Sequence, residues 1–169
     1  AWTLILCLAL LLTACGDRNS TEGMQSPYTY YYRTAQVGYD GEDGVIRGEI
    51  REIAGHEKDM TWILKDYFKG PHSEDLVSPF PKDLAVLEYQ VKEGTVFLTL
   101  SEAFSNLSGV ELSVAGACIA KTVFGQEDVN SVSILTEGGL LDGKLSLTLS
   151  REGLLLADGA GDLMRTEMT

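Results

Sequence analysis

Residues 108–125 read SGVELSVAGACIAKTVFG, and apolar side chains recur along them at helical spacing. Ser108 is followed three residues later by Glu111, which is the capping-box spacing of a helix N-terminus. Four small residues at 115–118 would let such a helix lie close to a sheet. The side chains on the stripe that would face this sheet are Leu112, Ala115, Ile119, Thr122 and Val123.

Strand patterns stand on both sides of this predicted helix. Before it, residues 84–91 (LAVLEYQV) and 95–100 (TVFLTL) alternate around a KEG turn, which predicts a β-hairpin. After it, residues 129–135 (VNSVSIL) predict another strand. Residues 145–149 (LSLTL) and 154–157 (LLLA), joined through Arg151, Glu152 and Gly153, predict a last hairpin.

Two further strands are predicted near the start of the chain. Residues 28–39 (YTYYYRTAQVGY) are rich in aromatic and β-branched residues, which favour strands. Residues 45–53 (VIRGEIREI) alternate with a period of two, as in a sheet that has one wet face. The apolar side of this strand would carry Ile46, Gly48 and Ile50, and the wet side Arg47, Glu49 and Arg51.

Residues 57–70 (EKDMTWILKDYFKG) change to a helical period, and Gly70 with Pro71 ends this segment. Its apolar face would consist of Met60, Ile63, Leu64, Tyr67 and Phe68. The resulting order, ββαββαβ plus a C-terminal hairpin, predicts an α+β fold. We expect a two-layer sandwich in which one mixed sheet carries two helices on one face.

The first residues resemble a bacterial export signal. Residues 2–12 form an uncharged apolar run that is too short to span a bilayer and is typical of a secretory signal core. The basic leader of such a signal is missing, so we interpret residues 1–14 as an N-terminally clipped signal peptide. Leu12-Thr13-Ala14-Cys15 resembles the lipobox of bacterial lipoproteins, in which the cysteine receives a diacylglyceryl group. Cys15 is therefore the predicted lipid-attachment residue, and an ordinary signal with a chance cysteine is the alternative.

The rest of the chain divides into a tether, one domain and a tail. Residues 15–27 would be the lipid anchor and a flexible tether, 28–158 a single domain, and 159–169 a disordered tail. Two acyl chains would hold the protein at the extracytoplasmic face of the cell membrane. The net charge of −12 argues against nucleic acid as a partner and predicts that the isolated domain is a monomer.

Several short motifs follow one another along the middle of the chain. They are Gly70-Pro71 after a helix, Ser78-Pro79-Phe80-Pro81 before a strand, Thr99-Leu100-Ser101 with Phe104 after the hairpin, Lys121-Thr122-Val123 in the long helix, and the strand 129–135 running to Gly138. In this order and spacing, Trp62 to Gly138 resembles the GerMN domain of the sporulation and spore germination protein family. Asp83 departs from the family, which often has glycine at that position.

The resemblance implies an assembly or scaffold domain rather than an enzyme. Family members are similar in fold to ring-building α/β modules of bacterial envelope machines, and one branch helps to assemble a transport channel between the two membranes of a developing spore. An envelope protein would then be the partner.

The sequence contains no recognisable catalytic or metal-binding motif. His56 and His72 stand in polar stretches and are expected at the surface, and Cys118 is expected in the core rather than as a nucleophile. Acidic clusters at 40–44 and 158–162 fit no known calcium loop, although weak calcium binding is an alternative. The prolines around Phe80 would set the path of the chain, with a recognition surface at Phe80 as the alternative. We therefore expect no catalytic residue, no metal and no cofactor.

Three functions of different class remain open. The first is a lipid-anchored extracytoplasmic assembly module of the bacterial cell envelope, with sporulation or germination as the candidate process. The second is an extracytoplasmic ligand-binding lipoprotein, and the third is an enzyme. A deep pocket would favour the second, whereas a shallow surface with an exposed strand edge would favour the first.

Overall fold

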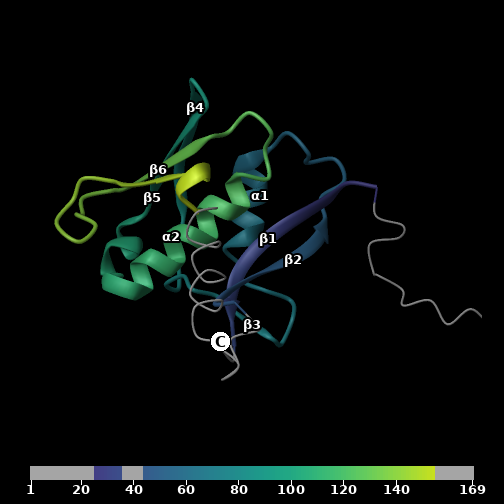
Figure 1. Ribbon diagram of the computed structural model, residues 1–169, viewed down its shortest axis with the longest axis horizontal. Coiled ribbons are helices and arrows are strands. Elements are labelled where there is room, and N and C mark those ends of the chain that lie inside the picture. Colours follow the sequence, from purple (N-terminus) through teal and green to yellow (C-terminus); the bar gives the residue numbers. More distant parts are fainter. Residues whose placement is uncertain (1–24, 36–43, 155–169) are drawn as a thin grey trace, which may run out of the picture.

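The computed structural model describes residues 25–35 and 44–154 (Figure 1). Its elements are β1 (Pro27–Thr34), β2 (Ile46–Glu52), α1 (Met60–Tyr67), β3 (Leu76–Val77), β4 (Val86–Lys92), β5 (Thr95–Leu100), the 3-10 helix η1 (Glu102–Asn106), α2 (Gly109–Val123), β6 (Ser131–Thr136) and β7 (Leu147–Ser150). The predicted signal at 1–14, the attachment residue Cys15, most of the tether, the tail at 159–169 and nearly all of both acidic clusters lie outside the described residues.

The predicted α+β class is confirmed, but the strands form two sheets instead of one. Sheet A has the order β2-β1-β3 and sheet B the order β4-β5-β6-β7. Beyond its two-residue pairing with β3, the edge of β1 that faces away from β2 is occupied by helix side chains, since the Tyr31 N–H donates to Thr122 Oγ1 and Tyr67 Oη donates to the Tyr31 carbonyl. Because these groups satisfy the backbone of Tyr31, β1 cannot extend sheet B along this edge.

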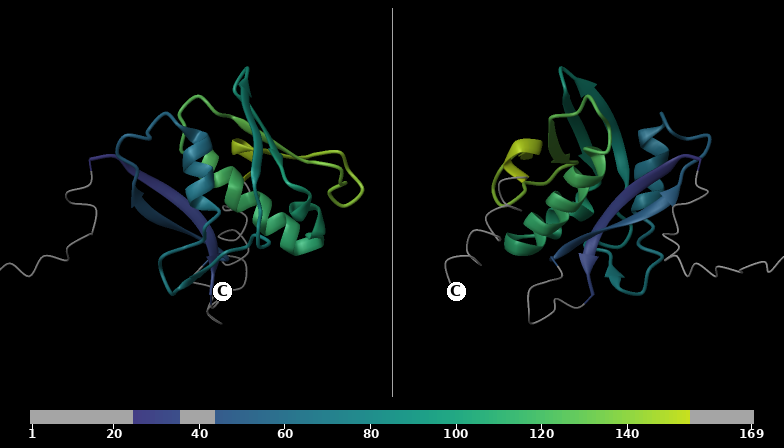
Figure 2. Two further views of the ribbon diagram at one scale, coloured as in Figure 1. Left: turned by 180° about the vertical axis from the view of Figure 1, so that it is seen from behind. Right: turned by 45° about the vertical axis from the view of Figure 1, so that its right-hand side comes forward.

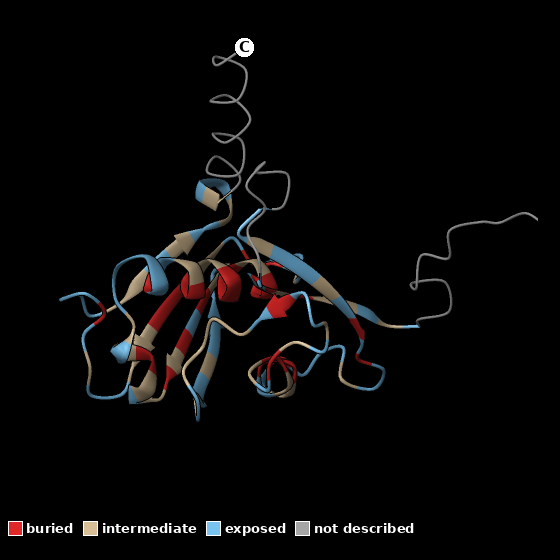
Figure 3. Cartoon of the chain, turned by 90° about the horizontal axis from the view of Figure 1, so that it is seen from below, coloured by how far each residue is buried: buried red, intermediate tan, exposed pale blue. Residues whose placement is uncertain are grey.

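Helix α2 lies between β1 and sheet B, as Figure 2 shows. Buried residues gather where α2 covers β5 and β6 (Figure 3), among them Leu98 and Ile134 on the sheet and Ile119 on the helix. A Cβ added at Gly116 would lie 2.5 Å from Leu147 Cδ2. The prediction that small residues let this helix approach a sheet closely is therefore confirmed.

The direction of the side chains on β2 differs from the prediction. Arg51, expected on the wet face, is 7% exposed, whereas Ile50 is 46% exposed. The antiparallel register opposite β1 places Glu49 beside Tyr30 and Arg51 beside Tyr28, on the tyrosine-lined face of sheet A. Arg51 faces inward because the Tyr32 hydroxyl and the Gly70 carbonyl accept its hydrogen bonds, and Glu49 beside it accepts backbone N–H groups of His72 and Ser73.

The first strand of the predicted C-terminal hairpin is confirmed as β7, which pairs with β6 as an antiparallel strand. Residues 151–154 form a helical turn, and residues 155–157 of the predicted second strand lie outside the described residues. Arg151 explains this path, because its Nη2 donates to the carbonyls of Phe124, Gln126 and Val129 in the segment that follows α2. These hydrogen bonds hold residues 151–154 close to the C-terminal end of α2.

Two elements have no counterpart among the predicted ones. β3 is a two-residue pairing of Leu76 and Val77 with the end of β1, and η1 is a single 3-10 segment after β5. Neither is long enough to produce a periodic pattern in the sequence. Over the described ranges, no helix has the length and apolar character to span a membrane.

Candidate functional site

The segment Ser78-Pro79-Phe80-Pro81 lies at the surface and is anchored to the core through Phe80. The Phe80 ring meets the rings of Tyr67 and Phe68 edge-on, at centroid distances of 5.0 and 4.9 Å. Such edge-to-face pairs are favourable arrangements of aromatic rings. The segment leads into β4, as predicted, and Phe80 also lines two surface grooves.

Asp83 follows this segment in the left-handed region, with φ of 63°. Glycine adopts this conformation without the steric cost of a Cβ, and aspartate tolerates it better than most residues. Asp83 therefore adopts a backbone conformation that glycine, the residue often found here in the GerMN pattern, adopts readily.

The first groove, which we name the Phe80 groove, has a volume of about 400 Å³ and is open to solvent. It lies between the Ser78–Pro81 segment, the end of β1 and the first turns of α2. Val110 on its rim is 79% exposed and Val45 is 45% exposed. Its lining residues include Arg33, Phe80, Leu107, Val110, Glu111 and Val114.

The second groove, which we name the lysine groove, has a volume of about 610 Å³ and is also open. It lies beside α1 and shares Ser78, Phe80 and Pro81 with the Phe80 groove. The basic residues on its surface are Lys65, Lys69 and Lys82, and Asp83 lies among them. Lys69 Nζ is 3.0 Å from Asp66 Oδ1.

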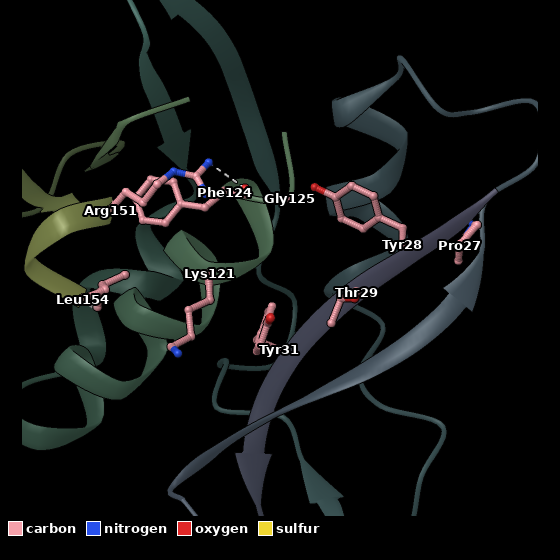
Figure 4. A pocket seen from close by; sticks show the side chains of 9 residues that line it. All are labelled: Pro27, Tyr28, Thr29, Tyr31, Lys121, Phe124, Gly125, Arg151 and Leu154. Carbon is pink, nitrogen blue, oxygen red and sulfur yellow. Dashed lines mark hydrogen bonds between the residues drawn. The ribbon is translucent and has the colours of Figure 1, made fainter. Parts of the chain in front are cut away.

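A third depression, of about 320 Å³, lies between β1 and the end of α2 (Figure 4). Arg151 lies beside Phe124 on one side of it, and Tyr28 points from β1 toward Gly125. These two side chains are engaged within the protein, since Arg151 donates to three carbonyls and Tyr28 Oη donates to the Thr122 carbonyl at 2.7 Å. The hydrogen bonds around this pocket therefore serve to hold parts of the fold together, and the Tyr28 bond connects β1 to α2.

Buried charge is concentrated in sheet A rather than in a groove. Arg51 Nη2 donates to Tyr32 Oη at 3.1 Å and to the Gly70 carbonyl at 2.7 Å, and its guanidinium carbon lies 4.8 Å from the centre of the Tyr30 ring. Arg51 also forms ion pairs with Glu49 and with Asp66. This cluster, which we name the Arg51 network, ties β2 to β1, to α1 and to the turn after α1.

The pKa values in the Arg51 network favour the charged forms of its members. Burial by itself would raise the pKa of Glu49, but backbone hydrogen bonds from Ser73 and His72 together with Arg51 hold it below its usual value. Burial would likewise raise the pKa of Asp66, and Lys69 and Arg51 lower it. Burial would lower the pKa of Arg51, but Glu49 keeps it above its ordinary value.

The residues that the sequence singled out lie apart from one another. Cys118 is buried, and burial raises the pKa of its thiol to about 12, so it is a core side chain as predicted. His72 is exposed as predicted, whereas His56 is half-buried because its ring stacks on Trp62 at 3.8 Å. No group of three or more potential metal ligands occurs in the part of the chain that the structure describes.

Two surface grooves and one buried network were not identified from the sequence. Lys65 and Lys82 are far apart in the sequence, and only the packing of the Ser78–Pro81 segment on α1 brings them to one groove. One feature of the sequence could have indicated the Arg51 network. The tyrosines at 28, 30 and 32 alternate along the strand, so that they lie on one side of β1 and supply hydroxyl groups there. Phe80, for which a recognition surface was the alternative, lines both grooves.

A family model described as Germane, sporulation and spore germination, matches residues 29–142. The tandem GerMN domains of the sporulation protein GerM from Bacillus subtilis have a similar structure, with 24% identity and a TM-score of 0.56. That likeness covers 74% of this chain and 44% of the tandem structure, so the chain spans less than half of that protein's length.

The first GerMN domain of the same Bacillus subtilis protein has a TM-score of 0.56 at 16% identity, over 75% of this chain and 98% of that domain. A candidate lipoprotein from Clostridium perfringens has a TM-score of 0.49 at 20% identity, over 75% of this chain and 87% of that one. At these identities the first two likenesses establish the fold alone. No curated protein sequence matches the chain.

Proposed function

Because the chain belongs to the Germane family of sporulation and spore germination domains, we propose that it is a lipid-anchored, extracytoplasmic assembly module of the bacterial cell envelope. It acts by binding an envelope protein during sporulation or germination, and it has no reaction of its own. The match over residues 29–142 carries this proposal, because it includes both sheets up to β6, both α-helices and the two grooves.

The surface of the domain supports a protein partner. The Phe80 groove and the lysine groove are open, and β4 forms the outer edge of sheet B. On that edge strand, Leu87 is 48% exposed and Val91 is 51% exposed. Exposed strand edges and open apolar grooves are suited to other polypeptide chains, whereas small ligands are usually enclosed.

The anchor supports a function that depends on local concentration. A diacylglyceryl group on Cys15 would keep the domain within the reach of its tether from the membrane. Confinement to this layer raises the effective concentration of a weakly bound membrane partner, as linking two binding modules does. A weak contact made by the isolated domain then becomes sufficient at the membrane.

The anchor is tested in the native host with the full leader in place. We expect Cys15→Ser to abolish incorporation of labelled fatty acid and to leave an unprocessed precursor, whereas Cys118→Ser should be labelled like the wild type. Equal labelling of the Cys15 variant would contradict lipid attachment at this residue.

The partner is tested by crosslinking intact host cells and purifying the lipidated protein. We expect mass spectrometry to recover one or more envelope proteins that are lost from the Cys15→Ser strain. If no envelope protein rises above background and a small molecule copurifies with the domain instead, the ligand-binding function replaces the assembly function.

A further inference from the structure

We propose that the two grooves beside Ser78–Pro81 form one docking surface for an extended acidic peptide segment of a partner protein. Apolar side chains of this segment would enter the Phe80 groove, and its carboxylates would lie in the lysine groove. The inference rests on the proposed function only in taking the partner to be a protein.

The two grooves are continuous because they share residues. Ser78, Phe80 and Pro81 line both, so a chain that leaves one groove enters the other without crossing the body of the domain. The Phe80 ring is held by Tyr67 and Phe68 and does not need to be ordered by the partner. A surface that is ordered before binding loses less conformational entropy when it binds.

The Phe80 groove is lined by apolar side chains that remain exposed to solvent in the folded domain. Val110 and Val45 are largely exposed on its rim, and Leu107 and Val114 line it beside Phe80. Its volume of about 400 Å³ is in the range of sites that enclose apolar groups. Apolar side chains of a partner segment would bury this area.

The lysine groove provides the charge that selects the segment. The residues that line the two grooves include four basic side chains (Arg33, Lys65, Lys69 and Lys82) and two acidic ones (Glu111 and Asp83), although the whole chain has a net charge of −12. Lys69 is paired with Asp66, whereas the ion pairs formed among the described residues include neither Lys65 nor Lys82.

An acidic segment is repelled by most of the surface of this protein and is attracted only where basic groups gather. Since the range of this repulsion is about one Debye length, roughly 8 Å at physiological salt, the local lysines decide where the segment binds. A flat bilayer could approach the lysines but could not enter the Phe80 groove. The combination of a concave apolar groove and lysines therefore favours a peptide over an anionic membrane.

The experiment measures fluorescence anisotropy of two labelled peptides with the full chain in zwitterionic bicelles. One peptide carries two phenylalanines followed by three glutamates, and in the other lysines replace the glutamates. We expect the glutamate peptide to bind at least tenfold more tightly. The double variant Lys65→Glu/Lys82→Glu should invert this preference.

Matched controls separate the docking surface from general charge and hydrophobicity. Lys58→Glu/Lys144→Glu changes the net charge by the same amount outside both grooves and should leave the preference unchanged. Val110→Gln should weaken binding of both peptides about fivefold or more, because an anchor contact is lost. Leu145→Gln should have no effect, although Leu145 is 79% exposed like Val110.

Three outcomes would overturn the inference. They are equal binding of the two peptides, equal effects of the two lysine pairs, and no effect of Val110→Gln. Lysine-dependent flotation with phosphatidylglycerol vesicles in place of peptide binding would assign the surface to the membrane instead. The labelling and crosslinking results above do not depend on these measurements, so failure of the docking surface is distinguishable from failure of the assembly function.

Discussion

Arg51 is charged and almost fully buried, and the groups around it provide opposite charges, hydrogen-bond acceptors and an aromatic ring. Glu49 and Asp66 provide carboxylates, Tyr32 and Gly70 provide oxygen acceptors, and the Tyr30 ring lies under the guanidinium. A buried ion pair adds little net stability when it is complete, because removing both charges from water is costly. Its importance appears when one partner is removed and the other remains buried.

Replacing Arg51 should therefore destabilise the domain strongly. We expect Arg51→Ala to lower the free energy of unfolding by about 3–5 kcal/mol, because Glu49 loses its ion pair while it stays largely buried, and the Tyr32 hydroxyl and the Gly70 carbonyl lose Arg51 as a hydrogen-bond donor. The measurement is urea unfolding of the fragment 28–158, followed by circular dichroism. As a control, Arg47→Ala should cost less than about 1 kcal/mol, since the Arg47–Asp75 pair is exposed. Similar losses at the two arginines would contradict the inward orientation of Arg51.

At the scale of elements, α2 joins the two sheets. Gly116 faces β7, where it lies against Leu147 and Leu149. Thr122 near its end caps the Tyr31 N–H on the edge of β1, and the Thr122 carbonyl accepts the Tyr28 hydroxyl. The helix therefore approaches sheet B closely at Gly116 and occupies the edge of β1 at Tyr31.

A larger side chain at Gly116 should separate α2 from β7. We expect Gly116→Val to lower the free energy of unfolding by about 1–3 kcal/mol, because the added atoms would overlap Leu147 and Leu149. The matched change Ser113→Val, at an exposed position of the same helix, should cost less than about 0.5 kcal/mol. Urea unfolding of both variants measures the difference. If Gly116→Val is as stable as Ser113→Val, the close approach of α2 to β7 is wrong.

At the scale of the whole molecule, stability should depend on pH through the acidic groups. The net charge of −12 produces repulsion at neutral pH that weakens as carboxylates become protonated. Glu49 and Asp66 act in the opposite direction, because their pKa values are lower in the folded protein than in the unfolded chain. Their contribution is fully present above the unfolded pKa values and is lost as the pH falls through the folded ones.

We therefore expect a stability maximum at mildly acidic pH and a steep loss below about pH 5. Urea unfolding midpoints measured from pH 7 to pH 3 would record stability on both sides of the maximum. In Glu49→Gln the loss below the maximum should be shallower, since one of the depressed carboxyl groups is absent. If the stability of that variant falls as steeply below the maximum as the stability of the wild type, Glu49 does not contribute to the loss.

The local patterns in the sequence determined most of the helices and strands. Helical spacing at 108–125 and 57–70, and alternation in the strands, depend on contacts between near neighbours along the chain, and the structure confirms these segments and the α+β class. The core position of Cys118 follows from the same local pattern. The resemblance of Trp62 to Gly138 to GerMN domains was also readable, because it consists of short motifs in order.

Only the tertiary structure decided which side of β2 faces inward, that the strands divide into two sheets, and that the lysine groove exists. Arg51 turns inward because Tyr32 and Gly70, distant in sequence, satisfy its charge, and β1 stays apart from sheet B because Thr122 and Tyr67 occupy its edge. Lys65 and Lys82 line one groove only after the Phe80 segment packs on α1. Such outcomes depend on partners brought together by folding, and a periodic pattern in one segment carries no information about them.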